Sequence, residues 1–390
     1  MSARDFIREE LTRLEEQGLL RSLRTLQTAQ GVRVQIDGKE YLSFCSNDYL
    51  GLAGHPRIFS AVRDTMKRFG WGAGAARLVA GTMGPHAELE RAIAEFKGAE
   101  AAIVFPTGYM ANVGTIPALV DEGDLVIGDR LNHGSIVDGC RLSRATFRFY
   151  EHVDVDDLRK RLKRRGEFRR ALIVTDSVFS MDGDLAPLPE IADIAREHDA
   201  MLMVDEAHAT GVFGESGRGV GEYYGVADRI DVCMGTLSKA VGSIGGFVCG
   251  SRDLVAFLRN RVRTFILTTA LPPAACAAST EGLRLIADSP HLRDRLWQNV
   301  RQVADLLAGL GLDAGRGASQ IFPIVVGDPD KATAVSSALG DSGLLIPAIR
   351  PPTVPKGTSR LRLTVSAAHS AEDIERLGKA LAEVKSSLDL

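Results

Sequence analysis

Two apolar segments of the sequence end in residues that could share one kind of chemistry. Residues 201–204 form an apolar run that is followed by Asp205 and, three positions later, by His208. A second apolar run, residues 232–234, leads to Lys239. Pyridoxal 5'-phosphate (PLP) needs a carboxylate that keeps its ring nitrogen protonated and a lysine amine that can form an imine. These residues and their spacing therefore predict a PLP site.

Each of these side chains also has a common structural role. Asp205 could cap a helix, which is the more frequent use of an aspartate after a strand, and His208 could make a local hydrogen bond. Most lysines are solvated, but Lys239 lies among small residues, which allow a bulky ligand to approach the backbone. Thr236 and Ser238 could supply hydroxyl groups to the phosphate or the ring oxygen. The combination, rather than any one residue, favours the cofactor.

Other polar residues follow apolar runs in the same way. Gly108 and Tyr109 stand at a glycine turn that begins a helix, where backbone N–H groups can bind phosphate. His133 follows another predicted strand and could stack on a planar ring, although a loop imidazole is more often solvated. Asn47 and Arg362, near the two ends of the chain, could reach the same site. An arginine on a strand can bind a carboxylate through two hydrogen bonds, and its alternative is a surface salt bridge.

The composition indicates a globular protein with no metal. The chain has 390 residues, of which 45% are hydrophobic and 25% charged, and its net charge is -3. Bulk charge therefore gives no reason to expect nucleic-acid binding. The sequence contains no apolar run long enough for a membrane span and no apolar signal segment. The five cysteines are scattered without a CxxC pair, which argues against zinc and favours a reducing compartment. We therefore expect a cytoplasmic protein with no nucleic-acid and no membrane partner.

Short apolar runs alternate with helical patterns between about residues 56 and 250. The runs comprise residues 101–105, 125–127, 171–175, 201–204, 232–234 and 246–249. This alternation predicts an α/β fold with a largely parallel sheet and helices on both faces. Ligands of such sheets bind beyond the carboxyl ends of the strands, which is where the residues described above stand.

The flanking sequence predicts two further parts. A helical pattern near the start precedes a hairpin around Asp37-Gly38. After about residue 290 we expect helices over 292–310 and 370–388, the second opened by a Ser370-x-x-Asp373 capping pattern, and strands over 321–326 and 360–365. The predicted division is an N-terminal helix and hairpin segment (1–45), a large domain (46–288) and an α+β C-terminal domain (289–390).

One basic cluster runs from Arg159 to Arg170. A solvated helix face is the more usual reading of such a run. The alternative is a landing surface for a phosphorylated or acidic acyl carrier.

Taken together, these motifs resemble the α-oxoamine synthases, a group of fold-type I PLP enzymes. The resemblance runs from about Ser46 to the C-terminus. It rests on SNDYLGL (46–52), GYMAN (108–112), FSMDGD (179–184), DEAHATGVFGESGRG (205–219), TLSKA (236–240) and RPPTVPKGTSRLRLT (350–364). It implies the aminotransferase-like fold type I, with a mainly parallel seven-stranded sheet in a large domain and a smaller α+β C-terminal domain. It also implies joining of an amino acid to an acyl thioester, with release of CO2 and the carrier thiol.

The resemblance implies roles for individual residues. Lys239 would be the imine lysine, Asp205 would lie at the ring nitrogen, His208 near the ring oxygen, and His133 on the ring, facing the substrate. The other implied cofactor contacts are Gly108, Tyr109, Ser180, Thr236 and Ser238. Asn47 and Arg362 would hold the amino-acid carboxylate, and Arg21 (or the equally placed Arg24) and Thr353 would contact the acyl substrate. Members build each site from two subunits of a homodimer, so Thr268 and Thr269 would reach the partner's cofactor.

Within the family, residues 349–355 are similar to those of members that condense L-alanine with a pimeloyl thioester in biotin biosynthesis. Leu267 and Ala76 depart from residues common in the family, which carries tyrosine and serine there. A glycine C-acetyltransferase (2-amino-3-ketobutyrate CoA ligase) and a serine palmitoyltransferase-like enzyme are alternatives. A non-catalytic PLP-binding regulator is an alternative of another class, and a nicotinamide-dependent reductase is disfavoured because no GxGxxG follows the first strand. The sequence leaves open whether the acyl carrier is CoA or acyl carrier protein.

Overall fold

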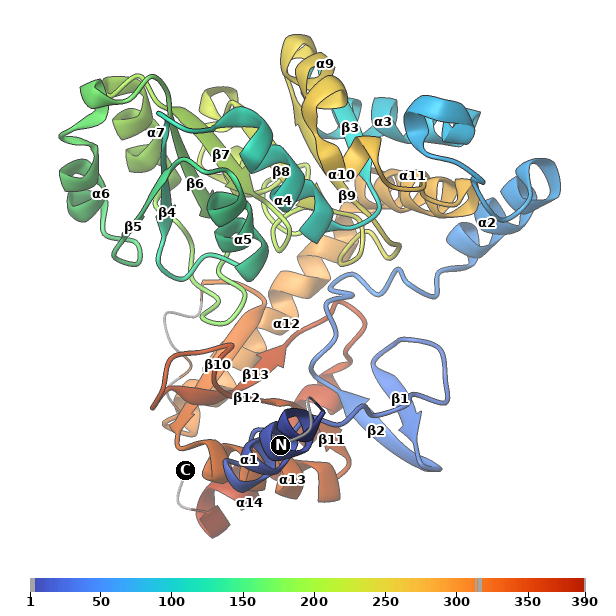
Figure 1. Cartoon of the computed structure of the whole chain (residues 1–390). Helices are drawn as coiled ribbons and strands as arrows, with labels where there is room; N and C mark the ends of the chain where they lie inside the picture. The colour runs from blue at the N-terminus through green and yellow to red at the C-terminus, as the bar shows by residue number, and fades with distance from the viewer. Residues whose placement is uncertain (1–3, 313, 315–317, 389–390) are drawn as a thin grey trace. The chain divides into compact units, whose positions relative to one another are not determined.

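The computed structural model describes residues 4–312, 314 and 318–388 (Figure 1). These residues divide into two compact units. The large unit comprises residues 47–180 and 184–295, and the small unit comprises residues 1–46, 181–183 and 296–390. The boundaries differ from those we expected, because the N-terminal helix and hairpin belong to the same unit as the C-terminal residues.

A seven-stranded sheet forms the centre of the large unit, in the order β3-β9-β8-β7-β6-β4-β5. All neighbours are parallel except β9, which is antiparallel to β3 and β8. The strands are β3 (Ala101–Phe105), β4 (Leu125–Asp129), β5 (Thr146–Tyr150), β6 (Ala171–Asp176), β7 (Met201–Asp205), β8 (Val232–Thr236) and β9 (Gly246–Gly250). The predicted α/β class and mainly parallel seven-stranded sheet are confirmed.

The inner strands are apolar because both faces of the sheet are covered. Every residue of β4 and β6 is buried, as expected of strands that lie between two layers of helices. The helices of this unit are α2 (Pro56–Phe69), α3 (Gly84–Lys97), α4 (Gly108–Leu119), α5 (Gly134–Leu142), α6 (Val155–Leu162), α7 (Leu188–Glu197), α8 (Val220–Tyr223), α9 (Arg252–Arg261), α10 (Arg263–Ile266) and α11 (Pro273–Asp288).

One strand, β5, is absent from the apolar runs of the sequence. It lies at the edge of the sheet, and its residues are mostly half-buried. Arg148 interrupts its aromatic residues, so it lacks the continuous apolar pattern of a central strand.

The small unit contains two three-stranded sheets. The hairpin β1 (Arg33–Ile36) and β2 (Lys39–Ser43) turns at Asp37 and Gly38, which both have positive φ, and β2 also pairs with β11 (Leu344–Leu345). The second sheet has the order β10-β13-β12, with β10 (Ile321–Gly327), β12 (Ala348–Ile349) and β13 (Ser359–Thr364). The remaining elements are α1 (Asp5–Glu16), α13 (Pro329–Asp341), α14 (Ala371–Leu388) and α12 (Pro290–Gly309), which runs across the boundary between the units.

The elements predicted for both ends of the chain are confirmed within one or two residues. The capping pattern before α14 is present, because Ser370 N–H donates to Asp373 and Asp373 N–H donates to Ser370 Oγ at 3.0 and 3.2 Å. No helix in the described ranges is both long and apolar enough to cross a membrane.

Candidate active site

A cavity of about 230 Å³ lies in the large unit, at the carboxyl ends of β6, β7 and β8. Residues at the start of α4 and α5 also line it. It is lined by Thr107, Gly108, Tyr109, Asn112, His133, Ser135, Asp176, Asp205, Ala207, His208, Met234, Thr236, Ser238 and Lys239. The structure thus brings together eight of the residues predicted from the sequence, and it does so at the strand ends where an open parallel sheet binds its ligands.

Asp205, the last residue of β7, is buried and held by two donors. Asn112 Nδ2 donates to its Oδ2 at 2.7 Å, and Ala207 N–H donates to its Oδ1 at 2.8 Å. Asn112 also donates to Ser135 Oγ at 2.9 Å. Donors to both oxygens favour the ionised carboxylate and fix its orientation, as a partner for a protonated ring nitrogen requires.

His133 is the N-cap of α5, and its ring is held in one tautomer. Ser135 N–H donates to His133 Nδ1 at 3.2 Å, and Ser135 Oγ lies 2.7 Å from the same nitrogen. Nδ1 is therefore an acceptor, and the neutral ring carries its proton on Nε2. Burial, together with the charge of Lys239, lowers the pKa of His133, while Asp205 opposes this shift. The ring is thus kept neutral, which suits stacking on a cationic pyridine ring.

His208 is connected to Asn47 through Tyr49. The Tyr49 hydroxyl lies 2.7 Å from His208 Nδ1 and donates to Asn47 Oδ1 at 3.1 Å. Tyr49 then accepts from Nδ1–H, so Nε2 is the nitrogen of His208 that can act elsewhere. Tyr49 is fully buried, and the sequence alone gave no reason to single it out within SNDYLGL.

Lys239 lies in the turn that follows β8. Near this turn, two backbone segments lie so close together that one of them has no room for a side chain. A Cβ on Gly246 would come within 2.6–2.7 Å of backbone atoms of Gly108 and Thr107. Glycine at 246 therefore allows the start of α4 to approach the sheet. Thr236 Oγ1 donates to Gly245 O and lies 2.8 Å from Ser238 Oγ, so both hydroxyls stand together beside the α4 N-terminus.

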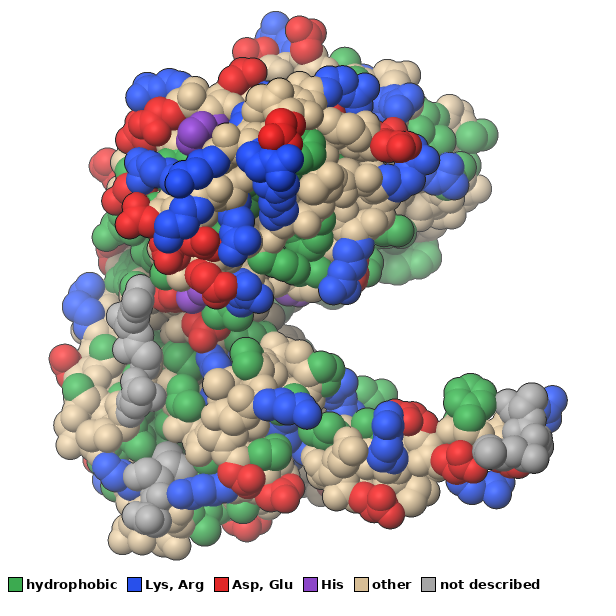
Figure 2. Space-filling model, turned by 60° about the vertical axis from the view of Figure 1, so that its left-hand side comes forward, with side chains coloured by type: hydrophobic (Ala, Val, Ile, Leu, Met, Phe, Trp, Pro, Cys, Tyr) green, Lys and Arg blue, Asp and Glu red, His purple; other side chains and the backbone are tan. Residues whose placement is uncertain are grey.

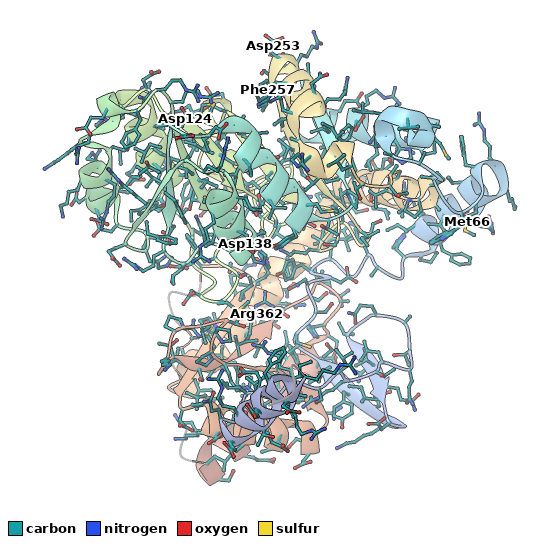
Figure 3. All side chains as sticks on the ribbon, in the orientation of Figure 1. Met66, Asp124, Asp138, Asp253, Phe257 and Arg362 are labelled. Atoms are coloured by element: carbon teal, nitrogen blue, oxygen red, sulfur yellow. The ribbon has the colours of Figure 1, made fainter. Side chains whose placement is uncertain are left out.

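Two acidic residues near the cavity were missed as site residues. Asp176, the last residue of β6, accepts the His133 N–H at 2.6 Å and pairs in register with Asp205. Burial raises the pKa of Asp176 well above its usual value, and the charge of Asp205 adds to this. Asp138 of α5, labelled in Figure 3, accepts a hydrogen bond from the Tyr109 hydroxyl at 2.8 Å. The signal for Asp176 was available, because it follows residues 171–175 as Asp205 follows residues 201–204.

Several predicted residues do not line this cavity. Ser180, Thr268 and Thr269 belong to the large unit but are not among the lining residues. Arg21, Thr353 and Arg362 belong to the small unit; Arg362 lies in β13 and is labelled in Figure 3. Their contacts with the cofactor or substrate remain predictions.

The residues of the cavity fit PLP. They supply a buried carboxylate with fixed orientation, a neutral imidazole, a lysine and the first amides of α4, which favour phosphate. Asn112 Oδ1 is a buried oxygen that accepts no hydrogen bond from the described residues. A buried acceptor of this kind is suited to a donor from a ligand.

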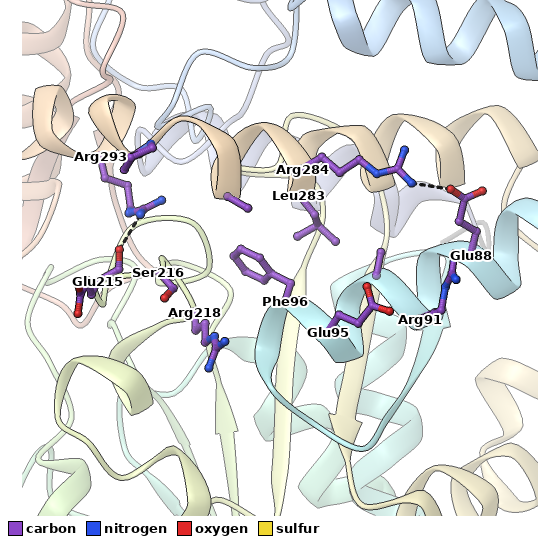
Figure 4. Close-up of a pocket in the computed structure, with 13 residues that line it drawn as sticks. Glu88, Arg91, Glu95, Phe96, Glu215, Ser216, Arg218, Leu283, Arg284 and Arg293 are labelled. Carbon is purple, nitrogen blue, oxygen red and sulfur yellow. Dashed lines mark hydrogen bonds and ion pairs between the residues drawn. The ribbon is translucent and has the colours of Figure 1, made fainter.

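A larger cavity, of about 660 Å³, lies elsewhere in the large unit between α3, α11 and the loop before α8 (Figure 4). Its charged lining residues partly neutralise one another, as in the pair of Arg284 and Glu88 at 2.8 Å. Arg293 donates to the backbone oxygen of Glu215. This cavity contains none of the predicted residues, whereas the smaller cavity contains eight of them.

The basic cluster of residues 159–170 is largely ion-paired. Arg161 pairs with Asp157, Arg164 with Glu167, and both Arg169 and Arg170 with Asp124. Acidic and basic side chains are interspersed over this part of the large unit (Figure 2). These contacts favour the interpretation that the cluster is a solvated helix face.

Comparison with known proteins identifies the family. The model of the family "Aminotransferase class I and II" matches residues 39–381. A relative named 8-amino-7-oxononanoate synthase, from Anaeromyxobacter dehalogenans, is 51% identical over 382 residues, which cover 98% of this chain and 96% of the relative. The chain is an α-oxoamine synthase of this family.

Solved structures of two kinds resemble this α-oxoamine synthase over nearly its whole length. A serine palmitoyltransferase from S. paucimobilis, solved with a PLP–myriocin adduct, has 34% identity and a TM-score of 0.93, covering 99% of this chain and 98% of its own. An 8-amino-7-oxononanoate synthase from Francisella tularensis has 27% identity and a TM-score of 0.77, covering 90% of this chain and 98% of its own. The α-oxoamine synthase thus shares its fold with enzymes that carry different names.

Proposed function

We propose that the chain is a PLP-dependent acyltransferase that condenses L-alanine with a pimeloyl thioester in biotin biosynthesis. The products would be 8-amino-7-oxononanoate, CO2 and the free carrier thiol. The observation that carries this proposal is the 51% identity, along nearly the whole chain, to a relative named 8-amino-7-oxononanoate synthase. The cavity at the strand ends supplies the groups that this chemistry needs.

Bound PLP would supply an electron sink for the bonds of the α-carbon. Asp205, held by Asn112 and the Ala207 amide, would keep the ring nitrogen protonated. His133 would cover the ring face, and His208 would lie near the ring oxygen. Lys239 would hold the cofactor and then move the α-proton at Nζ, because a lysine amine can act first as a nucleophile and then as a base.

The substrate contacts are part of the same proposal. Arg362 and Asn47 would bind the amino-acid carboxylate, which sets the α-bond that stands perpendicular to the ring. Arg21 and Thr353 would contact the acyl chain, and Ser180 would complete the phosphate site. Either CoA or acyl carrier protein would serve as the carrier.

We also propose that the enzyme is a homodimer with shared sites, in the cytoplasm. The segments of residues 71–79 and 267–269 meet in the bridge between Ala76 and Thr269. They expose large apolar side chains, namely Trp71, Leu78, Val79 and Leu267. Exposed apolar patches of this kind mark protein interfaces. A partner there would place Thr268 and Thr269 near a second cofactor. The five cysteines, all within the described part of the chain, are free, as expected in a reducing compartment.

A second candidate is a serine-using enzyme with a longer acyl chain. The similarity to serine palmitoyltransferase, with a TM-score of 0.93, favours it. The reaction type is the same, so only the amino acid and acyl donor distinguish the two candidates.

The test is release of free thiol from pimeloyl-CoA by PLP-loaded protein with alanine, glycine or serine. Release with alanine alone supports the proposal, and release with glycine or serine moves the chain to another branch. PLP binding without release from any acyl donor would instead favour a non-catalytic regulator. Lys239→Ala should abolish release, whereas Lys160→Ala, a matched change at an exposed lysine of α6, should leave it unchanged.

A further inference from the structure

His152, two residues after β5, lies between two buried carboxylates. Its Nδ1 is 2.9 Å from Asp129 Oδ1, and its Nε2 is 2.9 Å from Asp184 Oδ2. The His152 side chain is 22% exposed, while those of Asp129 and Asp184 are 0% and 9% exposed. None of these three residues lines the cavity described above.

Asp129, the last residue of β4, forms hydrogen bonds that hold the backbone segment leading to His133. Its Oδ1 accepts the Leu131 N–H at 2.8 Å, and its Oδ2 accepts the Val153 N–H at 2.9 Å. The segment from residue 130 to His133 is therefore attached, through one carboxylate, to the chain around His152. Val153 has a φ of +52°, a conformation that costs a β-branched residue energy, so this contact is maintained against local strain.

Asp184 and its neighbour Leu185 hold the backbone segment that carries Ser180. Its backbone oxygen accepts the Phe179 N–H at 3.0 Å, and a bridge joins Val178 to Leu185. The His152 ring meets the Phe179 ring edge-on at 4.4 Å. Asp184 and Phe179 thus fix the backbone immediately before Ser180, and His152 contacts both.

The two contacts require a charged ring. Each nitrogen faces a carboxylate oxygen, which only accepts hydrogen bonds, so both nitrogens must donate. Burial alone would lower the pKa of His152, but hydrogen bonds to Asp129 and Asp184 raise it to about 10. Burial and, to a lesser extent, Asp129 raise the pKa of the buried Tyr150 hydroxyl of β5. Arg130 and Glu151, which precede His133 and His152 in the chain, form an ion pair at 2.5 Å.

We propose that His152 is a positioning residue that, as an imidazolium between Asp129 and Asp184, holds the segments carrying His133 and Ser180 in register for the cofactor. Its consequence for PLP binding rests on the proposed function, but its consequence for the two segments does not. His152 acts through these segments and does not itself touch the reacting atoms.

The first arm of the test uses the protein without cofactor. His152→Gln should increase amide hydrogen exchange at residues 130–133 and 177–180. Asp124→Asn is the control, because Asp124 lies at the other end of β4 and its loss destabilises the sheet without reaching these segments. The proposal would be overturned if the exchange rates of residues 130–133 and 177–180 were the same in His152→Gln as in Asp124→Asn. Asp184→Asn, which keeps the size of the side chain, serves as a second variant if His152→Gln does not fold.

The second arm is the pH dependence of stability. The pKa of His152 is higher in the folded protein than its usual value of 6.5. Its contribution to stability is therefore complete below pH 6.5 and is lost as the pH rises towards 10. Between pH 7 and 9 the folding equilibrium constant of the wild type should fall about tenfold per pH unit relative to His152→Gln. If the stability of the two proteins changed with pH in the same way, His152 would not be an imidazolium in the folded protein.

The third arm measures PLP affinity. We expect His152→Gln to weaken PLP binding about ten- to a hundredfold, and Asp124→Asn to leave it nearly unchanged. PLP affinity of His152→Gln equal to that of Asp124→Asn would contradict the positioning role. If the wild type itself does not bind PLP, the proposed function fails, and the first two arms still decide the role of His152.

Discussion

Replacement of Asn112 by alanine would remove the side chain that orients Asp205. Asn112 Nδ2 donates to Asp205 Oδ2 at 2.7 Å, and both residues are almost fully buried. A hydrogen bond to a charged group contributes about 1.5–3 kcal/mol. Removal of the Asn112 oxygen, which accepts no hydrogen bond from the described residues, offsets part of this loss. We expect the variant to lose about 2 kcal/mol of stability without cofactor, and to bind PLP about 10- to 100-fold more weakly because the carboxylate is no longer fixed.

The matched control is Thr115→Val, one turn further along α4. The Thr115 hydroxyl is buried and has no hydrogen-bond partner among the described residues, so its replacement by a methyl group should be neutral or slightly stabilising. Urea unfolding of the two variants gives their stabilities, and titration with PLP, followed by the absorbance of the bound cofactor, gives their affinities. If Asn112→Ala matched Thr115→Val in both measurements, the assignment of Asn112 as the support of Asp205 would be refuted.

Two further predictions concern hydrogen bonds made by buried side chains. Burial alone would raise the pKa of Asp124, labelled in Figure 3, but hydrogen bonds from Arg169 and Arg170 hold it well below the usual value of 3.8. Its stabilising contribution is therefore present above pH 3.8 and is lost as the pH falls towards the lower folded pKa. Asp124→Asn should lower the free energy of unfolding by only about 1–2 kcal/mol at pH 7, because solvent screens the partly exposed arginines. Urea unfolding at pH 3 should show a smaller difference in stability between the variant and the wild type. The same difference at both pH values would contradict the pairing of Asp124 with the two arginines. Tyr49→Phe removes the hydroxyl that contacts His208 Nδ1 at 2.7 Å. We therefore expect kcat to fall about fivefold to tenfold, with the PLP affinity little changed. An unchanged kcat in the thiol-release assay would show that His208 does not need the Tyr49 hydroxyl.

The sequence allowed the grouping of polar residues at the strand ends to be predicted because parallel strands bring their carboxyl ends to one edge. Asp205 and Lys239 each follow an apolar run, and that rule alone places them in one cavity. The same rule applied to β6 would have found Asp176. Asn112 and Tyr49 could not be found in this way, because their roles come from contacts with Asp205 and His208, which lie far from them in the chain.

The limits of prediction for the fold have similar causes. Edge strand β5 lacks the continuous apolar run that marks a strand covered on both faces. The assignment of the N-terminal hairpin to the small unit depends on the pairing of β2 with β11, a contact between residues near opposite ends of the chain. A local sequence pattern carries no information about such a partner.

The pairing of β2 with β11 also sets an order of events during synthesis. The hairpin leaves the ribosome early, but Leu42 pairs with Leu344 and Ser43 with Leu345. At about 5–20 residues per second, its partner follows roughly 15–60 s later. The large unit has all of its residues by position 295, so it can fold while the hairpin still presents an unpaired strand edge. Such an edge is open to pairing with other chains, and the time between β2 and β11 is therefore the period in which a nascent chain most needs protection from aggregation.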